Sequence, residues 1–217
     1  MSMYRDLVDS GQEYLAHFGI LGMKWGKRNG PPYPLNSLTR TKIEVNKAKT
    51  FEKRITTDVK NACSNTSGEL YGLNNRLKTK KSIHRKINLG KNIKDAVRYT
   101  LLSNDEDFVN NYFKFKNSLR KKGYDEIVCK NYFEDYKKGL VKHKSVQSNF
   151  KSKDGYIFEV QFHTFSSQNA KDKKIPLYEE SRRENVEQNR MTKLIKEMEK
   201  LADEVPEPKN IKRIKSH

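Results

Sequence analysis

The sequence has little cysteine, only one tryptophan, no long apolar run and few negative charges relative to positive ones. Its two cysteines, Cys63 and Cys129, form no Cys-x-x-Cys pair and lie near no metal-spaced histidines, so we expect neither a disulfide framework nor a zinc site. No apolar run approaches the roughly 18 residues that cross a bilayer, and residues 1–10 lack the apolar stretch of a secretory signal. We therefore expect no membrane partner and a reducing, aqueous compartment.

The charge that is present is mostly positive. Forty-five Lys and Arg residues against 27 Asp and Glu residues give a net charge of +18 in 217 residues. Such a field attracts polyanions over a Debye length of about 8 Å, so nucleotides, RNA or packaged DNA are the expected partners. Basicity that only keeps the chain soluble is the alternative, because the basic residues are spread along the whole sequence.

The length allows one ordinary domain with extensions. A Gly- and Pro-rich stretch, residues 26–34, cannot continue a helix and separates an N-terminal segment, residues 1–35, from the rest of the chain. We expect one domain over residues 36–205 and a loose basic tail over residues 206–217.

The pattern of apolar residues predicts both helices and strands. The expected helices are Ser37 to about Asn61, one starting near Lys81, Asp107–Lys122 and Ser181–Val205. The expected strands are Val97–Leu102, Ile127–Phe133, Ser145–Lys151 and Tyr156–Thr164, the last two joined by an Asp-Gly turn. This order predicts an α+β fold in which a mixed β-sheet is flanked by helices.

Polar and apolar side chains alternate along the last expected strand. Glu159, Gln161 and His163 share one face, because successive side chains of a strand point to opposite faces. This face is either an ordinary solvated surface or part of a site. Asp95, just before the first expected strand, offers a second carboxylate.

Cations and hydroxyl groups are concentrated between Arg76 and Lys86, where a helix is expected to begin. Backbone N–H groups at a helix start, together with nearby Lys and Arg side chains, form sites for phosphate groups. A solvated run of charge is the alternative, because basic loops are common.

Taken in this order, the segments resemble the synthetase domain of the RelA/SpoT family, including its small stand-alone synthetases and related toxins. The resemblance covers about Arg54 to Arg183. The family grips ATP with Arg-x-Lys-x-x-x-Ser-x-x-x-Lys, binds metal through an Asp that opens a strand, and has a later Glu-Val-Gln-Ile-Arg-Thr strand. The corresponding residues here are Arg76, Lys78, Ser82 and Lys86, then Asp95, then Glu159 through Thr164 with Phe162 and His163 replacing Ile and Arg.

The segments that bind the acceptor in the family match this sequence less well than the ATP-binding segment does. Lys130-Asn131-Tyr132 resembles a Lys-Asp-Tyr segment, and residues 142–147 resemble Gly-Tyr-Arg-Ser-Leu-His. In this alignment His143 replaces the Tyr that stacks on the acceptor, and Gln147 replaces a His. Near Asp95, Arg98 comes earlier than the family's Arg, and the Gly between the Asp and that Arg is missing. The lysines around His143, which are Lys137, Lys138, Lys142 and Lys144, favour a polyanionic acceptor such as the 3′ end of tRNA.

The resemblance implies a nucleotidyltransferase-like fold and an ATP-dependent pyrophosphokinase, which transfers pyrophosphate from ATP to a 3′-hydroxyl of a nucleotide or tRNA. Mg²⁺ is the implied cofactor, since it takes carboxylate and phosphate oxygens as ligands. The implied catalytic and metal-binding residues are Asp95 and Glu159. The implied ATP-binding residues are Arg76, Lys78, Ser82, Lys86 and Arg98, and the implied acceptor-binding residues are Lys130, Tyr132, His143, Lys144, Gln147, Gln161 and His163.

The segment from His17 to Arg28 contains the only tryptophan and resembles a His-x-Gly-x-x-Gly-Met-Lys-Trp-Gly motif of tailed-phage head-associated proteins. Together with the RelA/SpoT resemblance, it implies a phage-encoded, toxin-like enzyme in the virion interior or host cytoplasm, with phage head proteins and packaged DNA as further partners. Two alternatives remain open. For the segment, the alternative is that it packs on the domain's own core. For the whole chain, the alternative is a non-enzymatic phage head-associated nucleic-acid-binding protein on a degenerate nucleotidyltransferase fold.

Overall fold

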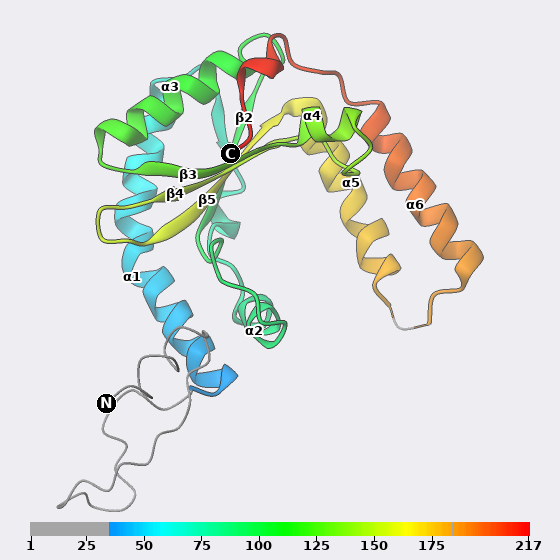
Figure 1. Ribbon diagram of the computed structural model, residues 1–217, viewed down its shortest axis with the longest axis horizontal. Helices are drawn as coiled ribbons and strands as arrows, with labels where there is room; N and C mark the ends of the chain where they lie inside the picture. Colours follow the sequence, from blue (N-terminus) through cyan, green and yellow to red (C-terminus); the bar gives the residue numbers. More distant parts are fainter. Residues whose placement is uncertain (1–34, 184) are drawn as a thin grey trace, which may run out of the picture.

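The computed structural model describes residues 35–183 and 185–217, so the predicted His17–Arg28 motif lies outside the described residues (Figure 1). The helices are α1 (Ser37–Ser64), α2 (Lys80–Asn88), α3 (Phe108–Lys121), α4 (Tyr132–Lys137), α5 (Phe165–Ser181) and α6 (Gln188–Asp203). The strands are β1 (Glu69–Tyr71), β2 (Arg98–Ser103), β3 (Asp125–Asn131), β4 (Val146–Lys151) and β5 (Ile157–Thr164). No helix in these ranges is long and apolar enough to cross a membrane.

The five strands form one mixed sheet in the order β1-β2-β5-β4-β3. β2 and β5 run parallel, and the other neighbouring strands run antiparallel. The sheet is flanked by helices, as Figure 1 shows, which confirms the predicted α+β class with its mixed sheet. The four predicted strands and the first three predicted helices are present, with ends shifted by a few residues.

One face of the sheet is apolar and packs on α1 and α3. Phe158, Val160 and Phe162 of β5 are almost completely buried there. The Phe162 ring makes edge contacts with the rings of Tyr112 and Phe115 on α3, at centroid distances of 5.0 and 5.5 Å. Burial of such side chains is the main stabilising contribution in a domain of this size, and it fixes the other face of β5 as the polar one.

α5 and α6 form a helical hairpin on the opposite side from α1 and α3 (Figure 1). The predicted helix over Ser181–Val205 is wrong at its start, because α6 begins only at Gln188. The sequence does not predict α5, since its buried residues are Ser167, Gln168 and Ala170 and it contains a proline, so it has no apolar period. β1 and α4 are likewise not predicted, since three and six residues carry too little pattern.

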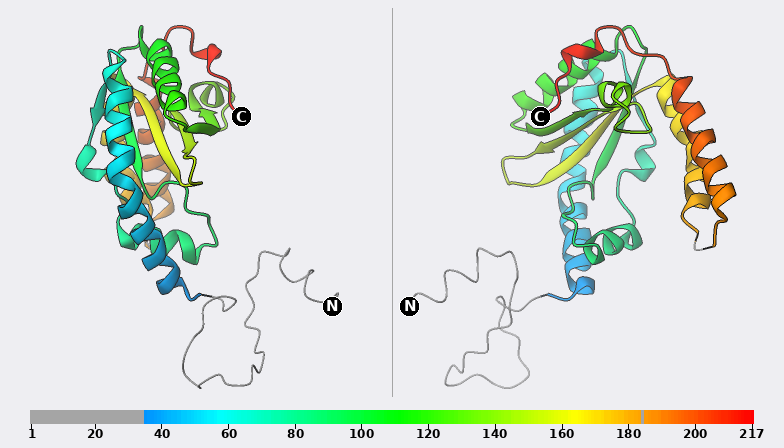
Figure 2. Two further views of the ribbon diagram at one scale, coloured as in Figure 1. Left: turned by 90° about the vertical axis from the view of Figure 1, so that its left-hand side faces the viewer. Right: turned by 45° about the vertical axis from the view of Figure 1, so that its right-hand side comes forward.

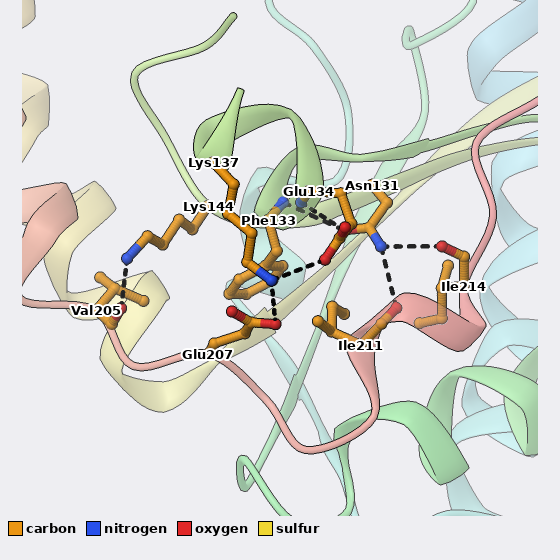
Figure 3. A network of polar contacts seen from close by, with 9 residues as sticks. All are labelled: Asn131, Phe133, Glu134, Lys137, Lys144, Val205, Glu207, Ile211 and Ile214. Carbon is orange, nitrogen blue, oxygen red and sulfur yellow. Dashed lines mark hydrogen bonds and ion pairs between the residues drawn. The ribbon is translucent and has the colours of Figure 1, made fainter. Parts of the chain in front are cut away.

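The basic tail is packed against β3, so the expectation of a loose tail is wrong. Ile211 and Ile214 are 1% and 2% exposed. The backbones of His217 and Cys129 exchange two hydrogen bonds of 2.9 and 3.0 Å. The Asn131 side-chain amide donates to the carbonyl groups of Ile211 and Ile214 at 3.1 and 2.9 Å, as Figure 3 shows. Two buried isoleucines and these hydrogen bonds hold the segment in place.

Candidate active site

The predicted ATP loop lies against the chain that enters β2. The Lys78 amide donates to the Ala96 carbonyl at 2.9 Å, and the Arg98 amide donates to the Arg76 carbonyl at 2.8 Å. α2 comes directly after this loop and lies beside the N-terminal half of α1, as both views of Figure 2 show. This pairing brings Lys78 to Asp95 although 17 residues separate them in sequence.

Asp95 is the centre of a charged cluster. Its Oδ2 accepts hydrogen bonds from Lys78 Nζ at 2.5 Å and from Lys86 Nζ at 2.7 Å. Burial alone raises the pKa of Asp95, but the hydrogen bonds from the two lysines outweigh burial and hold the pKa below its ordinary value. The residue is only 8% exposed, and its other oxygen, Oδ1, is buried with no hydrogen-bond partner in the described part of the chain. Asp95 is therefore an ionised carboxylate with one free oxygen.

Glu159 lies beside Arg98 in the register of β2 and β5. Burial raises the pKa of Glu159, the Gln161 side chain lowers it by donating to Oε1 at 2.6 Å, and the charge on Asp95 raises it again. The net pKa is above the ordinary value for a glutamate. The two predicted carboxylates therefore act on each other electrostatically.

The carboxylate oxygens of Asp95 and Glu159 are of the kind that a magnesium ion takes as ligands. Mg²⁺ is usually held by one or two carboxylates together with phosphate oxygens of a substrate. The lysines occupy only one oxygen of Asp95, which leaves Oδ1 free for a metal, and Glu159 supplies a second carboxylate. We expect Asp95 and Glu159 to be the protein ligands.

The other predicted ATP-binding residues differ in their surroundings. Arg98 is exposed next to Glu159 on the polar face. Arg76 is half-buried and paired through Nε with Glu52 of α1. Ser82 lies in the first turn of α2, where its amide donates to Thr79 Oγ1 at 3.3 Å. Lys78, Lys86 and Arg98 thus meet around the two carboxylates, whereas Arg76 and Ser82 have their own partners.

A cavity of about 220 Å³ lies between the polar face of the sheet and the α5–α6 hairpin. Of the predicted acceptor-binding residues, those that line it are His143, Lys144, Gln147, Gln161 and His163. Tyr132 adjoins the cavity, because its ring packs on the His143 ring at a centroid distance of 4.3 Å. Lys130 is exposed beside Gln147 in the register of β3 and β4 and does not line the cavity.

The polar face of β5 is not a solvated surface at this point. Gln161 and His163 are 9% and 3% exposed, so that alternative is wrong for both. His163 Nδ1 shares a hydrogen bond of 2.9 Å with Ser167 of α5. Burial lowers the pKa of His163 well below its usual value, and its imidazole is therefore neutral.

Two lysines of the cavity, Lys171 and Lys174 of α5, are not predicted from the sequence. Burial lowers the pKa of each to about 8. In the sequence they belong to one more run of charge, and nothing distinguishes them from the exposed Lys173 between them. Only a correct prediction of α5, which places positions 171 and 174 one turn apart, could have found them.

Comparisons with known proteins support the fold. The chain is similar to the crystal structure of the complex between the Type VI effector Tas1 and its immunity protein, with a TM-score of 0.50 and 15% identity over 75% of this chain and 94% of that one. Small alarmone synthetase 2 from Bacillus subtilis matches with a TM-score of 0.46 and 15% identity over 77% and 89% of the two chains. Small alarmone synthetase 1 from Bacillus subtilis, bound to its product pppGpp, gives 0.44 and 15% over 76% and 89%.

The family models add one short match. A model described as "Family of unknown function (DUF7211)" matches residues 8–32, which include the His17–Arg28 motif. No curated protein sequence matches the chain. What the comparisons show is the fold, which this chain shares with the Tas1 structure.

Proposed function

We propose that this chain is an ATP-dependent pyrophosphokinase, which transfers pyrophosphate from ATP to the 3′-hydroxyl of a nucleotide or tRNA. The observation that carries the proposal is the meeting of Lys78 and Lys86 on Asp95, whose charge in turn acts on Glu159. The resemblance assigns these residues to ATP and metal binding. Their convergence from three separate segments supports that assignment.

In this proposal the lysines at Asp95 leave its carboxylate and bind the triphosphate of ATP. Lys78 and Lys86, now bonded to Asp95, move to the ATP triphosphate, and the adjacent Arg98 adds a third cation. Phosphoryl-type transfer depends mostly on positioning and on neutralising charge, which is what these residues supply. Asp95 and Glu159 would hold Mg²⁺, which would neutralise charge on the phosphate oxygens.

Glu159 takes the proton of the acceptor hydroxyl. The Gln161 side chain donates to Glu159 Oε1 at 2.6 Å and orients this carboxylate for the proton transfer. The acceptor oxygen forms a bond to the β-phosphorus of ATP. The bond from that phosphorus to the oxygen shared with the α-phosphate breaks, and AMP leaves with the electron pair.

The test uses the full chain with Mg²⁺ and ATP labelled at the γ-phosphate, incubated separately with a nucleotide pool and a tRNA pool. We expect AMP and a labelled acceptor in at least one pool. Lys78→Ala should remove both products, because it deletes a triphosphate contact. Lys91→Ala, an exposed lysine beyond the C-terminal end of α2, is the matched control and should keep them. Wild-type protein that forms no AMP with either pool contradicts the proposal.

The cellular setting belongs to the same proposal. The resemblance of His17–Arg28 to phage head-associated proteins, together with that of the domain to RelA/SpoT toxins, suggests a phage-encoded, toxin-like enzyme that acts in the host cytoplasm or is carried in the virion interior. One solved structure that shares the fold is that of a complex between an effector and its immunity protein.

A non-enzymatic, phage head-associated nucleic-acid-binding protein is the second candidate. Its support is the net charge of +18 and the presence of His143 in place of a stacking tyrosine. Phage head proteins and packaged DNA are its partners. Binding of DNA by a wild-type chain that releases no AMP would favour this candidate.

A further inference from the structure

We propose that Lys171 and Lys174 of α5, with Lys144 and Ser145, form a subsite that binds a phosphate group of the acceptor. The inference rests on the proposed function and adds to it the residues that would hold a phosphate group of the acceptor close to the reacting ribose. The residues come from α5 and from the loop before β4, so two separate segments each supply part of the subsite.

The lining of the cavity is the first observation. Three lysines line it, and no aspartate or glutamate of the described part of the chain does. Its lining residues are His143, Lys144, Ser145, Gln147, Gln161, His163, Ser167, Ala170, Lys171, Lys174, Ala202 and Val205. The cavity is therefore a positively charged, partly buried space.

The lysines bond only to neutral groups. Lys171 Nζ donates to Gln161 Oε1 at 2.7 Å, and Lys174 Nζ donates to the Lys142 carbonyl at 2.9 Å. Lys144 Nζ donates to the Val205 carbonyl at 2.7 Å, which Figure 3 shows from close by. Within residues 35–183 and 185–217, none of the three has a carboxylate within 4.0 Å.

This arrangement is electrostatically unfavourable without a ligand. Desolvation disfavours the charged form of each lysine, and it lowers the pKa of all three. Asp203 and Glu207 act on Lys144, and Asp203 acts on Lys174, but neither carboxylate lines the cavity. An anion inside the cavity would neutralise the lysines at short range, where Coulomb attraction is strongest.

A free hydroxyl group is the second, independent observation. Ser145 is fully buried and lines the cavity, and its Oγ has no hydrogen-bond partner in the described part of the chain. A buried polar group without a partner is unfavourable, so a ligand oxygen there is favoured. Phosphate oxygens accept hydrogen bonds from both ammonium and hydroxyl groups, and a phosphate satisfies the lysines and the serine together.

The size and position of the cavity define which part of the acceptor it takes. Its volume of about 220 Å³ is below the roughly 300–1,000 Å³ of pockets that enclose a whole small ligand, so it suits one or two phosphate groups. Gln161 bonds to both Glu159 and Lys171, at 2.6 and 2.7 Å. A phosphate at Lys171 is therefore one side chain away from the proposed base.

The first experiment needs no catalysis. Inorganic pyrophosphate is titrated calorimetrically into the full chain carrying Lys78→Ala, which weakens competing binding at the ATP loop. Adding Lys171→Gln and Lys174→Gln should weaken binding about tenfold or more, because charge-assisted hydrogen bonds are lost. Lys173→Gln removes the same charge from an exposed position of α5 and should leave binding unchanged. Lys174→Gln alone, made in parallel, provides a second folded variant.

Equal binding by the lysine variants and the Lys173→Gln control would overturn the subsite. The second experiment identifies the source of the phosphate by measuring transfer to a nucleoside diphosphate and to tRNA. A rise in KM for one acceptor, with KM for ATP unchanged, supports the subsite and names that acceptor. No rise for either acceptor overturns it. Absence of AMP from wild-type protein contradicts the proposed function alone, since the pyrophosphate titration still tests the subsite.

Discussion

At the scale of single residues, alternation along β5 is enough to place three polar side chains on one face, and the structure has them there. Gln161 and His163 are nevertheless buried, because α5 covers them, and no pattern in β5 itself shows this cover. The charge state of Asp95 is equally invisible in the sequence, since it depends on two lysines that only the fold brings to one oxygen.

The first residue-scale prediction concerns Glu159. Glu159→Gln keeps the size of the side chain but removes the proposed base and one proposed metal ligand, so transfer should fall by about 10²–10⁴-fold. Release of AMP from labelled ATP measures it, and a thermal melt checks the fold. Glu179→Gln, whose side chain is 67% exposed, is the control and should match wild type. A Glu159→Gln enzyme within about threefold of wild type would contradict the assigned role.

The second residue-scale prediction concerns Lys171 and pH. Its pKa is about 8 in the folded chain, below the ordinary lysine value of 10.5, because of burial and of Arg98, while Asp172 and Glu159 oppose the shift. Below pH 8 the folded chain carries a desolvated charge, and between about pH 8 and 10.5 the unfolded chain binds more protons, so stability rises with pH in that window. The neutral His163 also faces Lys171 and adds no charge.

Lys171→Met should therefore raise the melting temperature by several degrees at pH 7 while weakening pyrophosphate binding. The gain should shrink as the pH rises above about 8. Thermal melts of wild type and variant across this range measure it. A melting temperature that falls equally at every pH would mean that the hydrogen bond to Gln161 matters more than the desolvated charge.

At the scale of elements, the sequence predicts those whose apolar period is long enough. α1, α3 and four strands bury apolar stripes and are found from sequence alone, whereas α5 buries Ser167, Gln168 and Ala170 and is not. Because the sequence does not predict α5, it also does not predict the helix that covers the cavity or the two lysines that this helix contributes. The C-terminal segment is missed for another reason, because two isoleucines at a spacing of three are too few to indicate packing.

The element-scale prediction concerns Asn131, which joins β3, α4 and the C-terminal segment. Its Oδ1 accepts from the Phe133 and Glu134 amides at the start of α4, and its Nδ2 donates to two carbonyl groups of the C-terminal segment. Asn131→Asp keeps the acceptor and loses the donor, so it should spare α4 but release residues 211–217. We expect a loss of about 1–3 kcal/mol in unfolding free energy.

Hydrogen exchange measures this change segment by segment. The amides of Ile214 and His217, which are bonded to Ile211 and Cys129, should exchange faster in Asn131→Asp. The amide of Glu134 should keep its protection, because the carboxylate still caps α4. Loss of protection at both ends, or at neither, would contradict the division of roles between the two atoms of the amide.

At the scale of the whole molecule, the excess of positive charge is less available than the sequence suggests. Of the four lysines expected to surround His143, Lys137 is paired with Glu207 at 2.6 Å and Lys142 is paired with Glu199. Lys144 is turned to a carbonyl at the cavity. The net charge of +18 remains, so a long-range attraction for polyanions is retained.

The whole-molecule prediction concerns the choice of acceptor. An RNA carries many phosphates and a nucleoside diphosphate few, so this basic chain neutralises more phosphate charge when it binds RNA. Added salt competes for the same phosphates, so the advantage of RNA falls as the salt concentration rises. We expect tRNA to be labelled in preference to free GDP or GTP when both are present at low salt, and the preference to fade between about 50 and 200 mM salt. Transfer of label from ATP, with the two products separated, measures the ratio.

Lys138→Gln removes an exposed charge near His143 and should weaken the preference. Lys153→Gln removes an exposed charge on the distant β4–β5 turn and should leave the preference unchanged. Preferential labelling of the free nucleotide, unchanged by salt and by Lys138→Gln, would show that contacts inside the cavity, and not the overall charge, select the acceptor.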